Sequence, residues 1–312
     1  MQFQKITGLM AATFTPFTPS GKLNLDIITL YAKTLRESEI SGVFINGTTG
    51  ENASLTHQEQ IDLIRAWAPF NDTNFKVVAM VSGTNQEQGK ELAALCHQLN
   101  IFGIAANAPF YTKPQSISQL LNFLSPIAAE APDLPFYFYH IPQLTQVNLS
   151  MIELLKNAHA FIPSFAGIKY THTNLMEFNQ CTRFAKGRYD ILWGWDEMLL
   201  AGLAMGAKGG VGSTYNFAAP LYKKIIKEFQ TGNLTTAKIL QEQSIDIIAH
   251  YPKFGGAAAG KILMKHIGLD FGDFRSPIPK IPKDQKNKLI QTLSEKGLLT
   301  NFIQSEENQI NP

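Results

Sequence analysis

The 312-residue chain has only two cysteines, Cys96 and Cys181. Both lie in helix-like patterns without metal-ligand neighbours, which excludes a disulfide framework and a thiolate metal site as the basis of the fold. Two reduced thiols are typical of a cytoplasmic protein. Ordinary packing in the interior is the simpler interpretation of both residues.

Charge and long apolar runs are also scarce. Charged residues make up 17% of the chain, and the formal net charge of +2 includes no dense run of one sign, so we expect neither nucleic acid nor an anionic membrane as a partner. The longest apolar stretch, Met198 to Ala207, is shorter than the roughly 20 residues that cross a bilayer. Met1 to Met10 lacks the apolar core of a secretory signal. A small-molecule substrate is therefore expected, and the low charge favours subunit contacts.

What the chain does contain is a repeated alternation of short apolar runs and amphipathic stretches, which continues to about residue 230. Most of the runs are continuously apolar, as in parallel strands that are covered on both faces. The eight predicted strands are Gly8 to Phe14, Gly42 to Asn46, Lys76 to Ser82, Gly103 to Ala108, Pro135 to Ile141, Phe165 to Thr171, Ile191 to Trp195 and Gly209 to Ser213.

The stretches between these runs begin with helix-start signals. In such a signal, a polar cap side chain and a Glu or Gln three residues later satisfy free backbone amides. Five pairs have this spacing: Thr56 with Glu59, Asn85 with Gln88, Ser116 with Gln119, Ser150 with Glu153, and Asn174 with Glu177.

Eight strand-then-helix units without a glycine-rich dinucleotide fingerprint predict a closed (β/α)8 TIM barrel over residues 1–230. An open doubly wound sheet is the alternative. Residues 231–312 are predicted to form a C-terminal helical extension packed on the barrel. Its predicted helices are Leu234 to His250, Ala257 to Ile267 and Lys283 to Glu295, and the prolines Pro277, Pro279 and Pro282 precede the last helix.

Because the active site of such a barrel is built at the carboxyl ends of the strands, the polar residues at those ends belong together. They provide an amine, a phenol, hydroxyls and carboxylates. The segments are Asn46 to Glu51, Tyr139 to Pro142, Lys169 to Thr171, Gly194 to Glu197, and Ser213 to Tyr215.

Lys169 is the most informative of these residues, because it ends a strand of buried neighbours. Burial disfavours an ammonium group and lowers its pKa, which leaves free amine that can attack a carbonyl. The alternative is a lysine whose stem follows the strand while its head reaches water.

The glycine-flanked turn of residues 47–50 offers hydroxyls and backbone amides that can hold a carboxylate. A plain turn that uses glycine for backbone freedom is the alternative. Side chains alternate along the run that contains Tyr137 and Tyr139, so we expect one of the two to face the barrel axis, which as core packing alone would be unremarkable.

Asp196 and Glu197 are interpreted either as hydrogen-bonding partners of a polyol or as acids at a helix start. The seven histidines show no spacing typical of a metal site, so no metal is expected. His140 and His172, near the mouth, are expected to be supporting or structural residues.

Five motifs occur in an order that resembles the N-acetylneuraminate lyase and dihydrodipicolinate synthase superfamily over nearly the whole chain. They are Gly47-Thr48-Thr49-Gly50-Glu51, Pro109-Phe110-Tyr111, Tyr139-x-Ile141-Pro142, Gly167-Ile168-Lys169 and Gly209-x-x-Gly212-Ser213. The resemblance implies that Lys169 forms a Schiff base with a 2-keto acid and that Tyr139 transfers protons. It also implies that Thr48 and Thr49 bind the substrate carboxylate, with no cofactor.

The synthase branch of this superfamily carries an arginine soon after the proline of the fifth strand, whereas here residues 142–145 read Pro-Gln-Leu-Thr. The chain is more similar to the sialic acid lyases, which implies cleavage of N-acetylneuraminate to pyruvate and N-acetylmannosamine. Tyr111 resembles a residue that enters the neighbouring subunit's site, which implies a homotetramer. The residues implied to contact the sugar chain are Thr171, Gly194, Asp196, Glu197 and Ser213.

Two alternatives to this activity stay open. One is another pyruvate-dependent aldolase or dehydratase of the same superfamily, acting on 2-keto-3-deoxy sugar acids or as a dihydrodipicolinate synthase. The other is a non-catalytic barrel that binds sugar acids and needs no reactive amine.

Overall fold

The computed structural model describes residues 3–81 and 83–303. Eight parallel strands close into one barrel in chain order, and β1 pairs with β8 from Gly8↔Gly209 to Ala11↔Gly212. The strands are β1 (Gly8–Ala12), β2 (Gly42–Ile45), β3 (Lys76–Met80), β4 (Gly103–Asn107), β5 (Phe136–His140), β6 (Phe165–Tyr170), β7 (Asp190–Trp193) and β8 (Gly209–Gly212). The predicted TIM barrel is confirmed, and the open sheet is wrong.

Each predicted strand is present, but all eight end one or two residues earlier than predicted. β2 stops before Asn46, whose φ of 55° leaves the extended conformation. β7 begins one residue early, at Asp190. Ser82, the predicted end of the third strand, lies outside the described residues. The residues that follow each strand are therefore loops at the barrel mouth.

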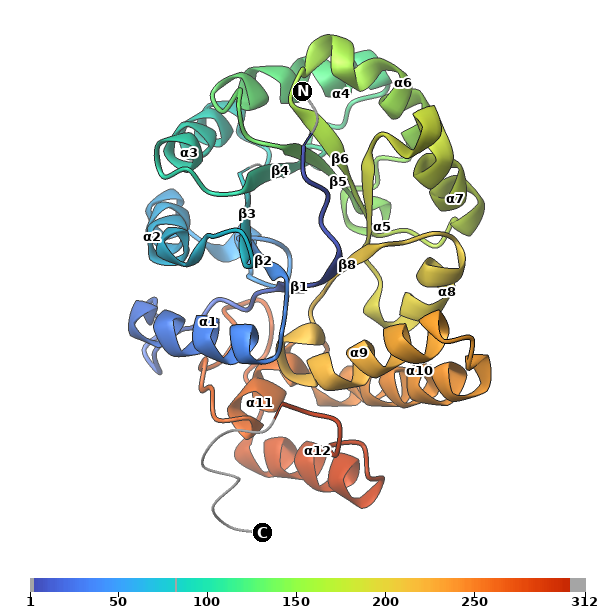
Figure 1. Cartoon of the computed structure of the whole chain (residues 1–312). Helices are drawn as coiled ribbons and strands as arrows, with labels where there is room; N and C mark the ends of the chain where they lie inside the picture. The colour runs from blue at the N-terminus through green and yellow to red at the C-terminus, as the bar shows by residue number, and fades with distance from the viewer. Residues whose placement is uncertain (1–2, 82, 304–312) are drawn as a thin grey trace.

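Helices surround the strands (Figure 1). They are α1 (Ile28–Glu37), α2 (His57–Trp67), α3 (Gln86–Gln98), α4 (Ile117–Ala129), α5 (Pro142–Thr145), α6 (Met151–Phe161), α7 (Leu175–Arg183), α8 (Leu199–Ala204) and α9 (Tyr215–Gln230). In all five predicted helix starts the cap side chain accepts from the backbone amide three residues later. Only Thr56 and Glu59 complete a reciprocal capping box.

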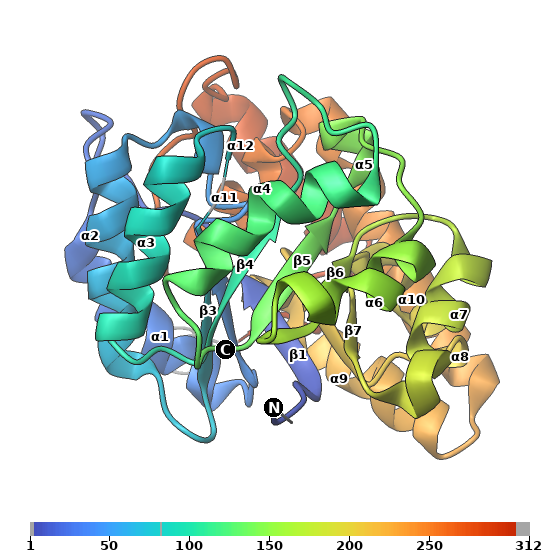
Figure 2. The same ribbon diagram turned by 90° about the horizontal axis from the view of Figure 1, so that it is seen from above.

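Three further helices follow the barrel: α10 (Leu234–Ala249), α11 (Ala258–His266) and α12 (Lys283–Glu295). α10 packs on α8 and α9, and α11 packs on α9 and α12 (Figures 1 and 2). The C-terminal helical extension is therefore confirmed. The division into units at residue 230 stays a prediction, and residues 304–312 lie outside the described part.

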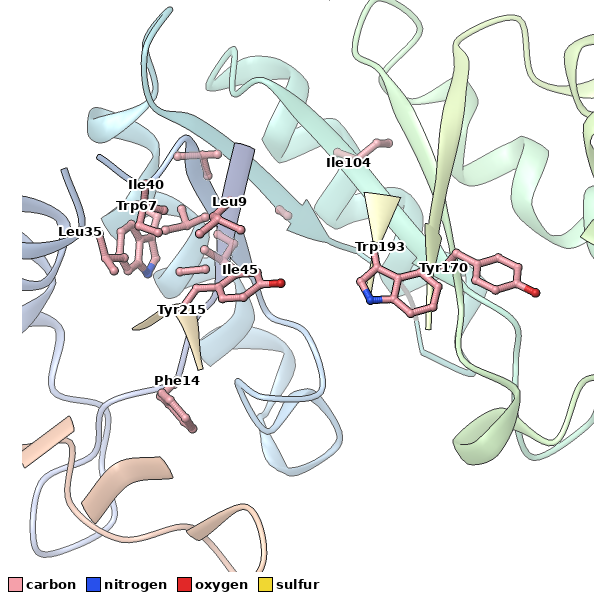
Figure 3. Packing of buried hydrophobic residues seen from close by; sticks show 14 of the residues in the cluster. Leu9, Phe14, Leu35, Ile40, Ile45, Trp67, Ile104, Tyr170, Trp193 and Tyr215 are labelled. Carbon is pink, nitrogen blue, oxygen red and sulfur yellow. The ribbon is translucent and has the colours of Figure 1, made fainter. Parts of the chain in front are cut away.

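Buried apolar side chains form two layers. The outer layer lies between strands and helices, and Figure 3 shows Leu35 and Trp67 of α1 and α2 near Ile45 of β2. The inner layer takes side chains from all eight strands and fills the barrel. Both Tyr137 and Tyr139 belong to it, so the expectation that only one faces the axis is wrong: residues two apart in a strand share a face.

None of the helices in the described ranges is long and apolar enough to cross a membrane.

Candidate active site

Lys169 lies on β6 opposite Tyr139 of β5. Its chain neighbours Ile168 and Tyr170 pack in the outer layer, so the lysine side chain points into the barrel. Lys169 is only 4% exposed, and its Nζ lies 4.0 Å from the centre of the Phe44 ring and 3.9 Å from that of Tyr139. The alternative in which this lysine head reaches water is therefore wrong.

The surroundings of Lys169 favour the neutral amine. Burial lowers the pKa of its amine to about 7, and the charge of Asp196 opposes the shift only in part. Near neutral pH a substantial fraction of the group is thus free amine, the form that attacks a carbonyl carbon.

Tyr139 supplies a protonated phenol beside this amine. Burial raises the pKa of its hydroxyl to about 12, while hydrogen bonds from the hydroxyls of Thr48 and Thr171 act in the opposite direction. Its oxygen lies 3.4 Å from Thr48 Oγ1. The phenol therefore keeps its proton at neutral pH and can relay it between the amine and a bound molecule.

The turn after β2 places the Thr48 hydroxyl beside that of Tyr139, and Thr49 is the next residue of the same turn. Neither Gly47 nor Gly50 has a positive φ, so backbone freedom does not explain these two glycines. A Cβ at Gly47 would lie 3.0 Å from the Phe44 ring, and one at Gly50 would lie 3.1 Å from the Thr13 carbonyl oxygen. The glycines instead allow the turn to pack closely against the end of the barrel.

Glu51 closes this turn with a φ of 59°, and its side chain points into the protein. Its two carboxylate oxygens accept separate hydrogen bonds: Oε1 from Lys261 Nζ at 2.8 Å and Oε2 from the Arg275 amide at 2.8 Å. Glu51 is part of a motif identified in the sequence, whereas Lys261 was not predicted to be part of the site. A lysine within the apolar stretch of residues 257–264 was the available signal.

Thr171 and Gly194, at the ends of β6 and β7, lie against each other. The Thr171 hydroxyl is 3.4 Å from the Gly194 carbonyl oxygen, to which it donates. A Cβ on Gly194 would lie 1.9 Å from Thr171 Oγ1 and 2.9 Å from the Tyr170 carbonyl oxygen. Only glycine permits this approach of the two strand ends.

Asp196 begins the short 3-10 turn after β7 (η5, Asp196–Met198), but its carboxylate faces β8. Oδ2 accepts from the Thr214 amide at 2.8 Å and from the Thr214 hydroxyl at 2.5 Å, and the Ser213 hydroxyl lies 3.5 Å away. Burial raises the pKa of the neighbouring Glu197 to about 7, and the Asp196 charge adds to the shift.

Tyr111 and His140 have other surroundings. Tyr111, between β4 and α4, is 88% exposed and so is not packed into the site of its own subunit. The His140 ring packs 5.1 Å from that of Tyr170, and burial lowers the pKa of His140 to about 3, so it is neutral. Within residues 3–81 and 83–303, no three His, Cys, Asp or Glu side chains gather as a group that could hold a metal ion.

The sequence profile of the dihydrodipicolinate synthetase family matches residues 5–296 of this chain. The chain belongs to this family. Among relatives, it is 35% identical over 295 residues to an N-acetylneuraminate lyase of Danio rerio, covering 93% of this chain and 96% of the relative.

Solved structures of the same family are similar over the whole fold. The N-acetylneuraminate lyase of Proteus mirabilis matches with a TM-score of 0.91 and 32% identity, covering 95% of this chain and 100% of that one. The sialic acid aldolase of Aliivibrio salmonicida matches with a TM-score of 0.91 and 34% identity, covering 95% and 99% of the two chains.

Proposed function

We propose that this family member is an N-acetylneuraminate lyase, a class I aldolase that cleaves N-acetylneuraminate to pyruvate and N-acetylmannosamine. The observation that carries the proposal is the Lys169 amine, buried at the barrel mouth between the rings of Phe44 and Tyr139 with its pKa lowered to about 7. The relatives named N-acetylneuraminate lyase support the choice of substrate.

In the first stage, the neutral Lys169 amine attacks C2 of the open-chain keto acid. The carbinolamine loses water, and a protonated imine links C2 to Nζ. The positive nitrogen then accepts the electron pair of a bond broken one carbon away, which is the polarisation that a Lewis acid supplies in metal-dependent aldolases. No cofactor is part of the proposal.

In the second stage, Tyr139 assists removal of the proton from the C4 hydroxyl. The C3–C4 bond breaks, its electrons pass to the iminium to form an enamine, and the C4 oxygen becomes the carbonyl of N-acetylmannosamine. Protonation of the enamine at C3 and hydrolysis of the imine release pyruvate and restore the Lys169 amine.

The proposed binding groups lie on both sides of this amine. Thr48 and Thr49 hold the keto-acid carboxylate from the turn after β2. The sugar chain lies along the loops after β6, β7 and β8, where the contacting residues are Thr171, Gly194, Asp196, Glu197 and Ser213. The absence of arginine from residues 142–145 supports a sugar acid over a second carboxylate substrate.

The proposed enzyme is a cytoplasmic homotetramer. Tyr111, 88% exposed, is the residue proposed to enter a neighbouring subunit's site. The two buried free cysteines, Cys96 and Cys181, support a reducing compartment.

Reduction with borohydride in the presence of pyruvate tests the chemistry, because it converts the imine to a stable amine on Lys169. Mass spectrometry should find the adduct in the parent protein and none in Lys169→Ala. Release of N-acetylmannosamine from N-acetylneuraminate tests the substrate, with a 2-keto-3-deoxy sugar acid as the competing candidate. A parent protein without an adduct would favour a binding barrel.

A further inference from the structure

Five buried side chains from three parts of the chain form a closed hydrogen-bond circuit behind the sugar side of the site. The carboxylate of Asp196 is 2.5 Å from Thr214 Oγ1, which is 2.6 Å from the Tyr222 hydroxyl. That hydroxyl is 2.7 Å from Ser244 Oγ, and Ser244 Oγ is 3.2 Å from Gln241 Nε2. Gln241 Nε2 also donates to the Asp196 carbonyl oxygen at 3.3 Å, which closes the circuit.

The Thr214 hydroxyl connects the Asp196 carboxylate to the rest of this circuit. A hydroxyl has one proton to give, and a carboxylate has none. Thr214 Oγ1 is placed to donate both to Asp196 Oδ2 and to the Tyr222 hydroxyl, so its single proton is shared between these two acceptors. In the bond between Tyr222 and Ser244 either hydroxyl can be the donor. The two protons of the Gln241 amide go to Ser244 and to the Asp196 carbonyl oxygen, so the circuit closes on Asp196.

The circuit connects the barrel mouth to the helical extension. Tyr222 is on α9, and Gln241 and Ser244 are on α10, which lies beside α9 (Figure 1). Gln241 Oε1 also accepts from the Leu200 amide at 2.8 Å, so the same side chain holds the start of α8. The loop that carries Asp196 is thus held from behind by α10.

We propose that Tyr222, Ser244 and Gln241 are positioning residues for recognition of the sugar end of the substrate, acting through Thr214 on Asp196. This inference rests on the proposed function. None of the three is among the proposed contact residues; their effect is to fix the carboxylate that is proposed to contact the sugar chain. Connected buried hydrogen bonds strengthen one another, so breaking one bond weakens the others.

Tyr222→Phe and Ser244→Ala each remove one hydroxyl from the circuit. In the synthesis direction, each should raise KM for N-acetylmannosamine about tenfold while KM for pyruvate changes less than about twofold, since one lost hydrogen bond corresponds to about tenfold in binding. Because both changes break the same hydrogen-bond circuit, KM for N-acetylmannosamine in the double variant should be no higher than in the more affected single variant. Ser244→Ala is the smaller change and keeps the test valid if Tyr222→Phe folds poorly.

Tyr137→Phe is the matched control. It also removes a buried tyrosine hydroxyl bound to an aspartate, since Tyr137 donates to Asp190 Oδ2 at 3.0 Å, but Asp190 begins β7 and Asp196 follows its end. This control should lower the melting temperature and leave the ratio of the two KM values unchanged.

A parallel rise of both KM values, an unchanged KM for N-acetylmannosamine, or multiplicative effects in the double variant would each overturn the circuit. A parent protein that traps no pyruvate under borohydride would instead overturn the proposed function, so the two failures are distinguishable.

Discussion

Lys261 of α11 and Glu51 of the turn after β2 form an ion pair of 2.8 Å in which both side chains are almost fully buried. The pair joins positions 210 residues apart in the chain. It fixes the left-handed residue that ends the turn carrying Thr48 and Thr49. The helical extension therefore supports the proposed carboxylate side of the site as well as its sugar side.

Replacing Lys261 with methionine should destabilise the protein by about 3–5 kcal/mol, because the Glu51 carboxylate would stay buried without its partner. Thermal and urea unfolding measure the change. Adding Glu51→Gln to Lys261→Met should recover much of the loss, since no buried charge remains.

Lys265→Met is the matched control for this change. It is the same substitution one turn later on α11, and it breaks an exposed pair with Asp270, for which a loss below about 1 kcal/mol is expected. Equal losses of unfolding free energy in Lys261→Met and Lys265→Met would show that the buried pair stabilises the protein no more than the exposed pair.

Tyr139→Phe should lower kcat by about 10²–10⁴-fold and leave pyruvate binding largely intact, because it removes the proposed proton relay without removing the ring beside Lys169. Steady-state kinetics with N-acetylneuraminate measure the first effect, and reductive trapping of pyruvate measures the second. Parental turnover in this variant would refute the role assigned to the phenol.

The rate at which pyruvate is trapped should rise with pH through about 7 and then level off. The pKa of the Lys169 amine is lowered to about 7, so protons leave the nucleophile in this range, and only the free amine attacks. Cyanoborohydride trapping between about pH 5.5 and 9 provides the profile. A rate that is still rising at the upper end of this range, as the ordinary lysine pKa of 10.5 would give, would contradict the buried, neutral amine.

The lowered pKa of the Lys169 amine also makes the free energy of unfolding depend on pH. Between about pH 7 and 10.5 the unfolded chain holds a proton on Lys169 that the folded protein lacks, so this lysine's destabilising effect decreases as the pH rises. Lys169→Met should therefore be more stable than the parent, with a larger difference at pH 7 than at pH 9. A pH-independent difference in urea unfolding would argue against the shift.

Local features of the fold were predictable, because short segments encode them. The pair Thr56 and Glu59 predicts a helix start from four residues, and the apolar run before Lys169 predicts a buried strand. The closed barrel then brings Lys169, Tyr139 and Thr48 together, since each stands at the carboxyl end of its strand.

Contacts between distant segments were not predictable from these patterns. Nothing near Glu51 in the sequence points to Lys261, and nothing near Asp196 points to Gln241 or Ser244. Such pairings depend on how the helical extension packs on the barrel, which periodicity does not specify. The inward direction of both Tyr137 and Tyr139, by contrast, follows from their spacing of two and could have been predicted.

Gly194→Ala tests how closely the ends of β6 and β7 must approach. The added methyl would meet Thr171 Oγ1 at 1.9 Å and the Tyr170 carbonyl oxygen at 2.9 Å, so the loop after β7 must shift by more than a side-chain rotation allows. We expect a loss of about 1–3 kcal/mol in the free energy of unfolding. KM for N-acetylneuraminate should also rise, because Asp196 and Glu197 move with the loop.

Gly83→Ala, where an added Cβ meets no atom within 4 Å, is the control and should leave both quantities unchanged. Parental stability and KM in Gly194→Ala would mean that the strand ends have room to separate, and the tight contact between Thr171 and Gly194 would then have no part in shaping the site. A loss of stability without a change in KM would mean that the contact matters for folding and not for substrate binding. Asp196 and Glu197 would then still reach the sugar chain from a displaced backbone.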